Sequence, residues 1–256
     1  NAASYQVFRE FINSAQADYS PAFYGKNELV YASARTDIKN PAVLNSGSYP
    51  GESNSQLFKS NISRRGSLGK PKLLLEGIQA KTKIGPVAFS KDKQSVFYTQ
   101  NNFAEGNRWF SHKSLVLSLY AADIDNNQNW TGTKSLPFNE GNHSVGFPVL
   151  AEDGKTLLFA SDMPGGQGGF DLYVTYRQGN SWSKPVNLGP NVNTEGDEIT
   201  PFIIGSILYF SSNWHWGLGG FDIFSAKQSS GAWVDITNLG KELGAQEQAR
   251  TLNQKI

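Results

Sequence analysis

The sequence predicts an all-β chain, and more specifically a β-propeller built from four-stranded antiparallel blades. Its 256 residues include 26 Gly, 16 Phe and 10 Tyr, a composition typical of many short strands joined by tight turns. Helical periodicity is hard to find, and only residues 241–256, at the very end, have a helix-like composition. A repeated segment decides the architecture, because self-similarity at a fixed spacing is the mark of repeat folds.

The repeat is clearest in two segments that lie 51 residues apart. Residues 159–173 read FASDMPGGQGGFDLY, and residues 210–224 read FSSNWHWGLGGFDIF. The same offset relates Trp182 to Trp233, and the Asn-Leu-Gly at 187–189 to the one at 238–240. These two copies begin near Pro148 and Pro201, and weaker copies begin near two earlier prolines, Pro21 and Pro86.

Each copy reads as four strands, which is the period of a propeller blade. We expect the first strand of each copy directly after its proline. In the first copy, further strands are expected at 28–32 and around 57–58. In the second they are expected at 95–99, at 115–121 and from Trp130, and in the third at 156–160, 171–175 and 182–188. The fourth copy repeats the pattern of the third. The predicted blades are 18–84, 85–144, 145–198 and 199–240, with 4–12 as an outer or closing strand and 241–256 of uncertain structure. Four blades are visible, and a complete ring could hold five or six.

Composition excludes several classes of protein. The formal net charge is +1, which argues against a nucleic-acid binder. Without cysteine there can be no disulfide scaffold and no thiolate metal site. No apolar run is long enough for a transmembrane helix. The chain begins at Asn1 with no leader pattern, so we expect a processed piece whose targeting signal is not in view.

Four segments carry a resemblance to a known family: SPAFYGKNELVYASAR, GPVAFSKDKQSVFYTQNN, SVGFPVLAEDGKTLLFASDMPGGQGGFDLY and NLGPNVNTEGDEITPFI. They resemble the PD40-type, WD40-like propeller repeats of Bacteroidetes OmpA-family lipoproteins, and within that group a component of the type IX secretion system. The resemblance implies an exported, periplasmic module associated with the outer membrane. It also implies protein partners there, and peptidoglycan association through domains that this chain lacks.

The candidate partner-binding residues lie on loops that leave one end of the blades, where a rigid scaffold usually carries recognition. They are Arg35, Asn101, Asn102, Asp162, Asn213, Trp214, His215 and Trp216. Two Trp flanking a His could stack on a peptide side chain, a sugar or a partner surface, or could pack over a neighbouring blade. Asn101, Asp162 and Asn213 share one repeat position, where a side chain can also simply hold the turn.

Searches for catalytic chemistry are negative, and we expect no catalytic residue, metal site or cofactor. Neither a nucleophile elbow nor a zinc-protease motif occurs in the sequence. Glu195, Asp197 and Glu198 could hold a cation, but a solvated linker is the simpler interpretation. The predicted function is therefore a non-enzymatic, protein-binding scaffold. The alternatives are a propeller that binds glycan or peptidoglycan fragments through the same Trp loop, and, less favoured, a glycoside hydrolase with paired carboxylates.

Overall fold

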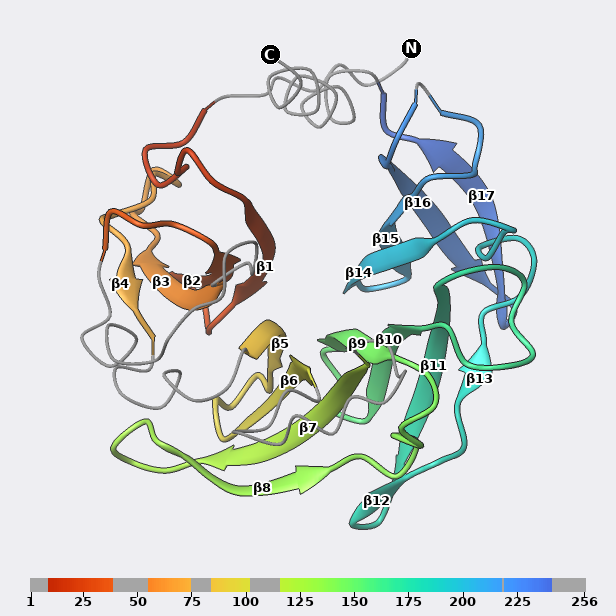
Figure 1. Cartoon of the computed structure of the whole chain (residues 1–256), viewed down its shortest axis with the longest axis horizontal. Coiled ribbons are helices and arrows are strands. Elements are labelled where there is room, and N and C mark those ends of the chain that lie inside the picture. Colours follow the sequence, from red (N-terminus) through yellow and green to blue (C-terminus); the bar gives the residue numbers. More distant parts are fainter. Residues whose placement is uncertain (1–8, 39–54, 75–83, 102–115, 218, 241–256) are drawn as a thin grey trace, which may run out of the picture. The chain divides into compact units, whose positions relative to one another are not determined.

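The computed structural model describes residues 9–38, 55–74, 84–101, 116–217 and 219–240 (Figure 1). Within these ranges it contains strands β1 to β17 and no helix, so none of the described residues forms a helix that could cross a membrane. The predictions for residues 241–256 and for Asn102 fall outside these ranges. Of the predicted strand 4–12, only residues 9–12 are described, and they form no strand.

The strands form four antiparallel sheets, each following chain order. The first two sheets contain β1 (Asp18–Phe23), β2 (Glu28–Ser33), β3 (Gln56–Asn61) and β4 (Lys72–Leu73), then β5 (Ile84–Phe89), β6 (Ser95–Asn101), β7 (Leu117–Ile124) and β8 (Trp130–Ser135). The third contains β9 (Val145–Leu150), β10 (Thr156–Ser161), β11 (Asp171–Gln178), β12 (Ser181–Trp182) and β13 (Val186–Asn187). The fourth contains β14 (Glu198–Ile204), β15 (Ile207–Ser212), β16 (Asp222–Ser229) and β17 (Ala232–Asn238). These sheets are the four blades of the β-propeller that the sequence predicted.

The chain divides into two compact units, and the division falls inside β9, between Pro148 and Val149. The N-terminal unit, residues 9–148, holds β1 to β8. The described part of the C-terminal unit, residues 149–240, holds β10 to β17.

The first strand of each blade begins before the proline that recurs in the repeat, rather than after it. In three blades the residue before that proline has a left-handed backbone: φ is 51° at Ser20, 55° at Phe147 and 50° at Thr200. The register of β1 shifts between Tyr19 and Ala22, which is a β-bulge. The strand therefore continues through the proline. At the bulge the proline does not have to donate a hydrogen bond to the neighbouring strand, so its missing N–H does no harm.

The outer strand of the third blade, predicted as one strand over 182–188, is divided into β12 and β13. Both pair with β11. Pro185 lies between them, and a proline has no N–H to contribute to a ladder. The two short pieces keep the outer edge of the blade in place around that interruption.

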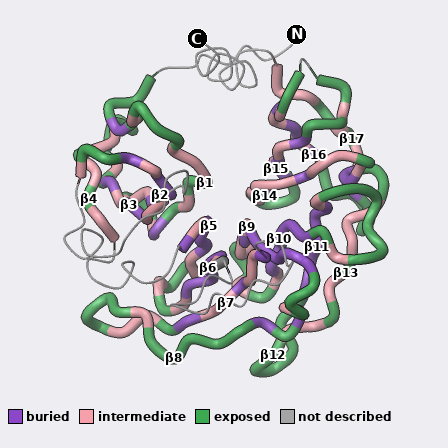
Figure 2. The backbone as a smooth tube through the Cα atoms, viewed as in Figure 1, coloured by how far each residue is buried: buried purple, intermediate pink, exposed green. Residues whose placement is uncertain are grey.

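Aromatic side chains at repeated positions build the core of the C-terminal unit. Phe159 on β10 stacks on Tyr173 of β11 at 5.9 Å between centroids, and Phe210 on β15 stacks on Phe224 of β16 at 5.8 Å. All four rings are buried, and Figure 2 shows the burial concentrated along β10 and β11. Strand β14 lies against β10 and β11, so the two blades of this unit share an apolar interior.

Candidate binding surface

Three loops meet at one end of the C-terminal unit, and we call this surface the loop end. They are the β10–β11 loop (162–170), the β13–β14 connection (188–197) and the β15–β16 loop (213–221, of which residue 218 lies outside the described residues). The strand register aligns their bases, because Ser161 pairs with Asp171, and Ser212 pairs with both Glu198 and Asp222. The Glu198 N–H donates to the Phe170 carbonyl at 2.6 Å, which joins the two blades at this end.

Asp197 connects the two hairpin loops. Its N–H donates to Asn213 Oδ1 at 2.7 Å, and Asn213 Nδ2 donates back to Asp197 Oδ2 at 2.9 Å. Its other carboxylate oxygen accepts the Phe170 N–H at 2.9 Å. Asn213 thus uses both ends of its amide to join its loop to the β13–β14 connection, rather than to hold its own turn.

Glycines allow these loops to pack backbone against backbone. A Cβ at Gly168 would lie closer than 3.0 Å to backbone atoms of Glu195 and Thr194. A Cβ at Gly196 would meet Asn213 Oδ1 and the Cβ of Trp214 equally closely. Any larger residue at these two positions must move a neighbour, so the glycine-rich motif serves close approach here.

His215 is half-buried and belongs to the scaffold. Its Nε2 lies 2.8 Å from the Val192 carbonyl oxygen, and since a carbonyl can only accept, that nitrogen carries the proton. The ring packs at 5.1 Å from Phe224 and 5.7 Å from Phe210. These contacts anchor the β15–β16 loop onto the core of its own blade.

The two tryptophans on either side of His215 are exposed. Trp214 is 60% exposed and Trp216 is 98% exposed. Their backbones are fixed, because the Trp214 N–H donates to Ser212 Oγ and the Trp216 carbonyl accepts from Asn238 Nδ2, both at 3.2 Å. The loop therefore presents two indoles outward from an anchored backbone, and Trp216 covers almost none of the protein's own surface.

Buried carboxylates lie beneath the loop end, and sequence analysis did not assign them this role. Glu198 is fully buried and accepts from Thr194 N–H at 2.7 Å, Thr194 Oγ1 at 2.6 Å and Ser212 Oγ at 2.6 Å. Asp171 is also fully buried; Oδ2 accepts from the Gln167 N–H and from Asn187 Nδ2, while Oδ1 has no partner among the described residues. The recurrence of Asn-Leu-Gly in the sequence could have indicated the buried aspartates. Nδ2 of Asn187 lies 2.9 Å from Asp171 Oδ2, and Nδ2 of Asn238 lies 3.5 Å from Asp222 Oδ2 in the next blade.

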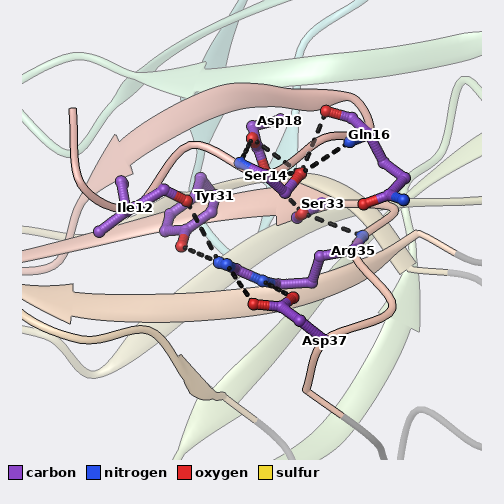
Figure 3. Close-up of polar contacts among 8 residues, drawn as sticks. All are labelled: Ile12, Ser14, Gln16, Asp18, Tyr31, Ser33, Arg35 and Asp37. Carbon is purple, nitrogen blue, oxygen red and sulfur yellow. Dashed lines mark hydrogen bonds and ion pairs between the residues drawn. The ribbon is translucent and has the colours of Figure 1, made fainter. Parts of the chain in front are cut away.

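In the N-terminal unit, Arg35 is buried and engaged by its neighbours (Figure 3). Its Nε and Nη2 donate to the two carboxylate oxygens of Asp37 at 2.8 and 3.0 Å, and Nη1 donates to the Tyr31 hydroxyl at 3.1 Å and the Ile12 carbonyl at 3.3 Å. The hydrogen bond from Arg35 lowers the pKa of Asp37, and burial raises the pKa of Tyr31. A cleft of about 720 Å³ lies beside this pair and is lined in part by Phe11 and Lys70.

The remaining predicted residues are placed as follows. Asp162 is exposed and directly follows β10, and Asn101 is the last residue of β6, opposite Leu117. Within the described residues, no three His, Asp or Glu side chains gather in a way that could hold a metal ion. Of the acidic linker, Glu195 is exposed, whereas Asp197 and Glu198 are used by the hydrogen bonds above.

Comparison with known proteins identifies the fold. No protein-family model matches the chain, and no curated protein does. Among solved structures, a protein of unknown function from Dyadobacter fermentans is 14% identical with a TM-score of 0.52; the match covers 91% of this chain and 72% of the other. Hydrazine synthase from Kuenenia stuttgartiensis is 14% identical with a TM-score of 0.51, covering 88% of this chain and 33% of the other. The chain has a β-propeller fold.

TolB from Acinetobacter baumannii is also similar, at 15% identity and a TM-score of 0.46, a value too low to carry an argument. That match covers 87% of this chain and 44% of TolB, so the chain spans less than half of TolB. At these identities the shared property is the fold alone, and the function has to be argued from the loop end itself.

Proposed function

We propose that this chain is a non-enzymatic scaffold module that binds a protein partner, with Trp214 and Trp216 as the anchors. The observation that carries the proposal is the 98% exposure of Trp216 and the 60% exposure of Trp214 on a loop in which the Asn213 and His215 side chains are hydrogen-bonded to the scaffold. Buried Trp side chains dominate the energetics of protein interfaces. An anchored loop also loses little conformational entropy when a partner binds.

The location of the protein in the cell is part of the same proposal. The resemblance of the repeats to those of OmpA-family lipoproteins, and most closely to PorE of the type IX secretion system, supports an exported protein in the periplasm, associated with the outer membrane. There it would contribute to a secretion assembly that links outer-membrane components to peptidoglycan, the latter contacted by domains outside this chain. A β-propeller is suited to a role in such an assembly, because its blades form a rigid support for loops that can bind a partner.

The test compares partner capture by the wild-type chain and by a double variant carrying Trp214→Ala and Trp216→Ala. Truncating an anchoring Trp at an interface costs about 2 kcal/mol or more, which corresponds to roughly a 30-fold or greater loss of affinity. Partners captured from an envelope extract would be purified and their dissociation constants measured for both forms. Tyr176→Ala is the matched control, since Tyr176 is an aromatic residue that is 47% exposed on the part of β11 remote from the loop end. Equal affinity of the double variant and the wild type would refute the assignment of the surface.

Glycan binding is the second candidate, and one observation favours it: the 98% exposure of Trp216 leaves its ring faces open, as stacking on a sugar requires. Titration of the chain with muropeptides separates the two. Binding of muropeptides that is lost in the double variant, without capture of any protein, would replace the protein-binding proposal. Turnover of a glycoside panel at ordinary enzymatic rates would overturn the non-enzymatic part.

A further inference from the structure

The loop end has a strong charge asymmetry, which extends the proposed function to the chemistry of the partner. Its three loops carry the exposed acids Asp162 and Glu195, together with the half-buried Asp197, and no Lys or Arg. The basic residues of the described C-terminal unit all lie elsewhere, in the β9–β10 turn, on or after the remote parts of β11 and β12, and on β16 beyond its middle: Lys155, Arg177, Lys184 and Lys227.

Two buried acids lie beneath the same loops. In the described part of the chain, Glu198 accepts hydrogen bonds from neutral donors alone, namely the N–H and hydroxyl of Thr194 and the hydroxyl of Ser212. Asp171 has only amide donors, and its Oδ1 has no partner among the described residues. Within the described residues, therefore, no basic side chain forms a hydrogen bond with either carboxylate. The exposed acids Asp162 and Glu195 give this surface a negative potential.

The tryptophans lie within this acidic surface. A Cβ placed on Gly196, the residue between Glu195 and Asp197, would lie 2.5 Å from the Cβ of Trp214, so Trp214 lies beside the most acidic segment of the loop end. No hydrogen bond or ion pair of the Glu195 carboxylate occurs within the described part of the chain, and the side chain is exposed. An exposed indole attracts a cation over its face, and a neighbouring carboxylate strengthens the preference for the same kind of ligand.

We propose that the loop end recognises a positively charged segment of a protein, with a Lys or Arg side chain lying against Trp214 or Trp216 and its charge facing Glu195. This inference rests on the proposed function and narrows it. A purely apolar partner would leave the carboxylates unpaired at the interface, and an acidic one would be repelled by them.

Fluorescence titration of the 256-residue chain tests the inference, with tetra-arginine, tetra-glutamine and tetra-glutamate peptides as probes. We expect tetra-arginine to bind most tightly, and its affinity to fall as the salt concentration rises, because surface charges are screened. Trp216→Ala and Glu195→Gln should each weaken tetra-arginine binding about 2- to 5-fold, the change expected of an exposed cation–π contact or ion pair.

Glu152→Gln is the matched control, because it makes the same charge change at an exposed residue of the β9–β10 turn, at the opposite end of the unit. It should leave tetra-arginine binding unchanged. The inference is overturned if the three peptides bind alike, if Glu195→Gln binds as the wild type does, or if the two Glu variants weaken binding equally. None of these results affects the proposed function, which is tested separately by partner capture with the double Trp variant and by the muropeptide and glycoside assays.

Discussion

Gly168→Ala tests whether the loop end depends on close packing of its backbones. The new Cβ would lie closer than 3.0 Å to three backbone atoms, the C and O of Glu195 and the O of Thr194, where ordinary contact begins at about 3.4 Å. Backbone atoms cannot change rotamer to relieve a clash as a flexible side chain can. The β10–β11 loop must therefore move away from the 194–196 segment. Overpacking of this kind costs about 1–3 kcal/mol, which corresponds to a fall in Tm of roughly 2–12 °C for a chain of this size.

Thermal and urea unfolding, followed by circular dichroism, would measure the effect. Gly69→Ala is the control, because a Cβ there would meet its nearest atom at an ordinary 3.5 Å and should change stability by no more than about 0.5 kcal/mol. We also expect faster hydrogen exchange at the amides of Phe170 and Glu198, which bond across the two loops. If Gly168→Ala unfolded at the same temperature as Gly69→Ala, the close-packing account of the glycine motif would be wrong.

Three further predictions concern stability. Glu198→Ala should destabilise the chain by about 3 kcal/mol in urea unfolding, since it leaves the buried Ser212 hydroxyl and the two half-buried donors of Thr194 without their acceptor; an unchanged midpoint would contradict this. Ser20→Ala should leave the free energy of unfolding unchanged or raise it, because the buried Ser20 hydroxyl has no partner in the described residues. Thr200→Ala should lower it by about 1 kcal/mol, because the 2.8 Å hydrogen bond between the Thr200 and Ser211 hydroxyls is lost. A larger loss of stability in Ser20→Ala than in Thr200→Ala would refute the comparison. The ion pair from Arg35 lowers the folded-state pKa of Asp37, so its stabilisation is present above the unfolded value of about 3.9 and is lost as the pH falls through the folded value. Asp37→Asn should therefore be less stable than wild type at pH 6 but close to it at pH 2, and a gap that stayed constant would exclude this linkage.

The blade architecture could be predicted because the repeat encodes it at positions that fold alike. Phe159 and Phe210 occupy the same place in successive blades, and each stacks on an aromatic residue of the next strand. Leu157 and Leu208, at a second repeated position, are also buried in both copies, as stacked repeats require of the positions that face a neighbour. The four sheets consequently follow the four copies, even in the first half of the chain, where the repeat is weak.

The course of the first strands could not be predicted, because it depends on an unusual backbone conformation. A proline normally marks the end or edge of a strand, which places the strand after it. The left-handed conformations of Ser20 and Thr200 instead create a bulge that carries the strand through the proline. Left-handed conformations are rare for residues other than glycine, and rarest for β-branched ones such as Thr200, so composition contains no sign of this bulge.

The hydrogen-bonding roles of the candidate residues could not be predicted from the sequence. Asn213 and His215 are as polar as any ligand-binding pair, yet their hydrogen bonds go to Asp197 and Val192. Arg35 likewise donates to Asp37, Tyr31 and a carbonyl. The partners of Asn213 and His215 lie on loops 16 and 23 residues away, and a single sequence does not reveal such pairings.

The repeat itself separates the residues that the fold needs from those it does not. Asn213 aligns with Asp162 of the preceding blade, and both follow a buried serine at the end of their strand. Trp214 and Trp216 align with Met163 and Gly165, so the third blade forms the same loop without any aromatic residue at these places. A blade therefore does not require tryptophan there, and the fold gains little from a side chain that is 98% exposed. The difference between these two blades, which otherwise share the loop, therefore supports the proposal that the two indoles contact another molecule.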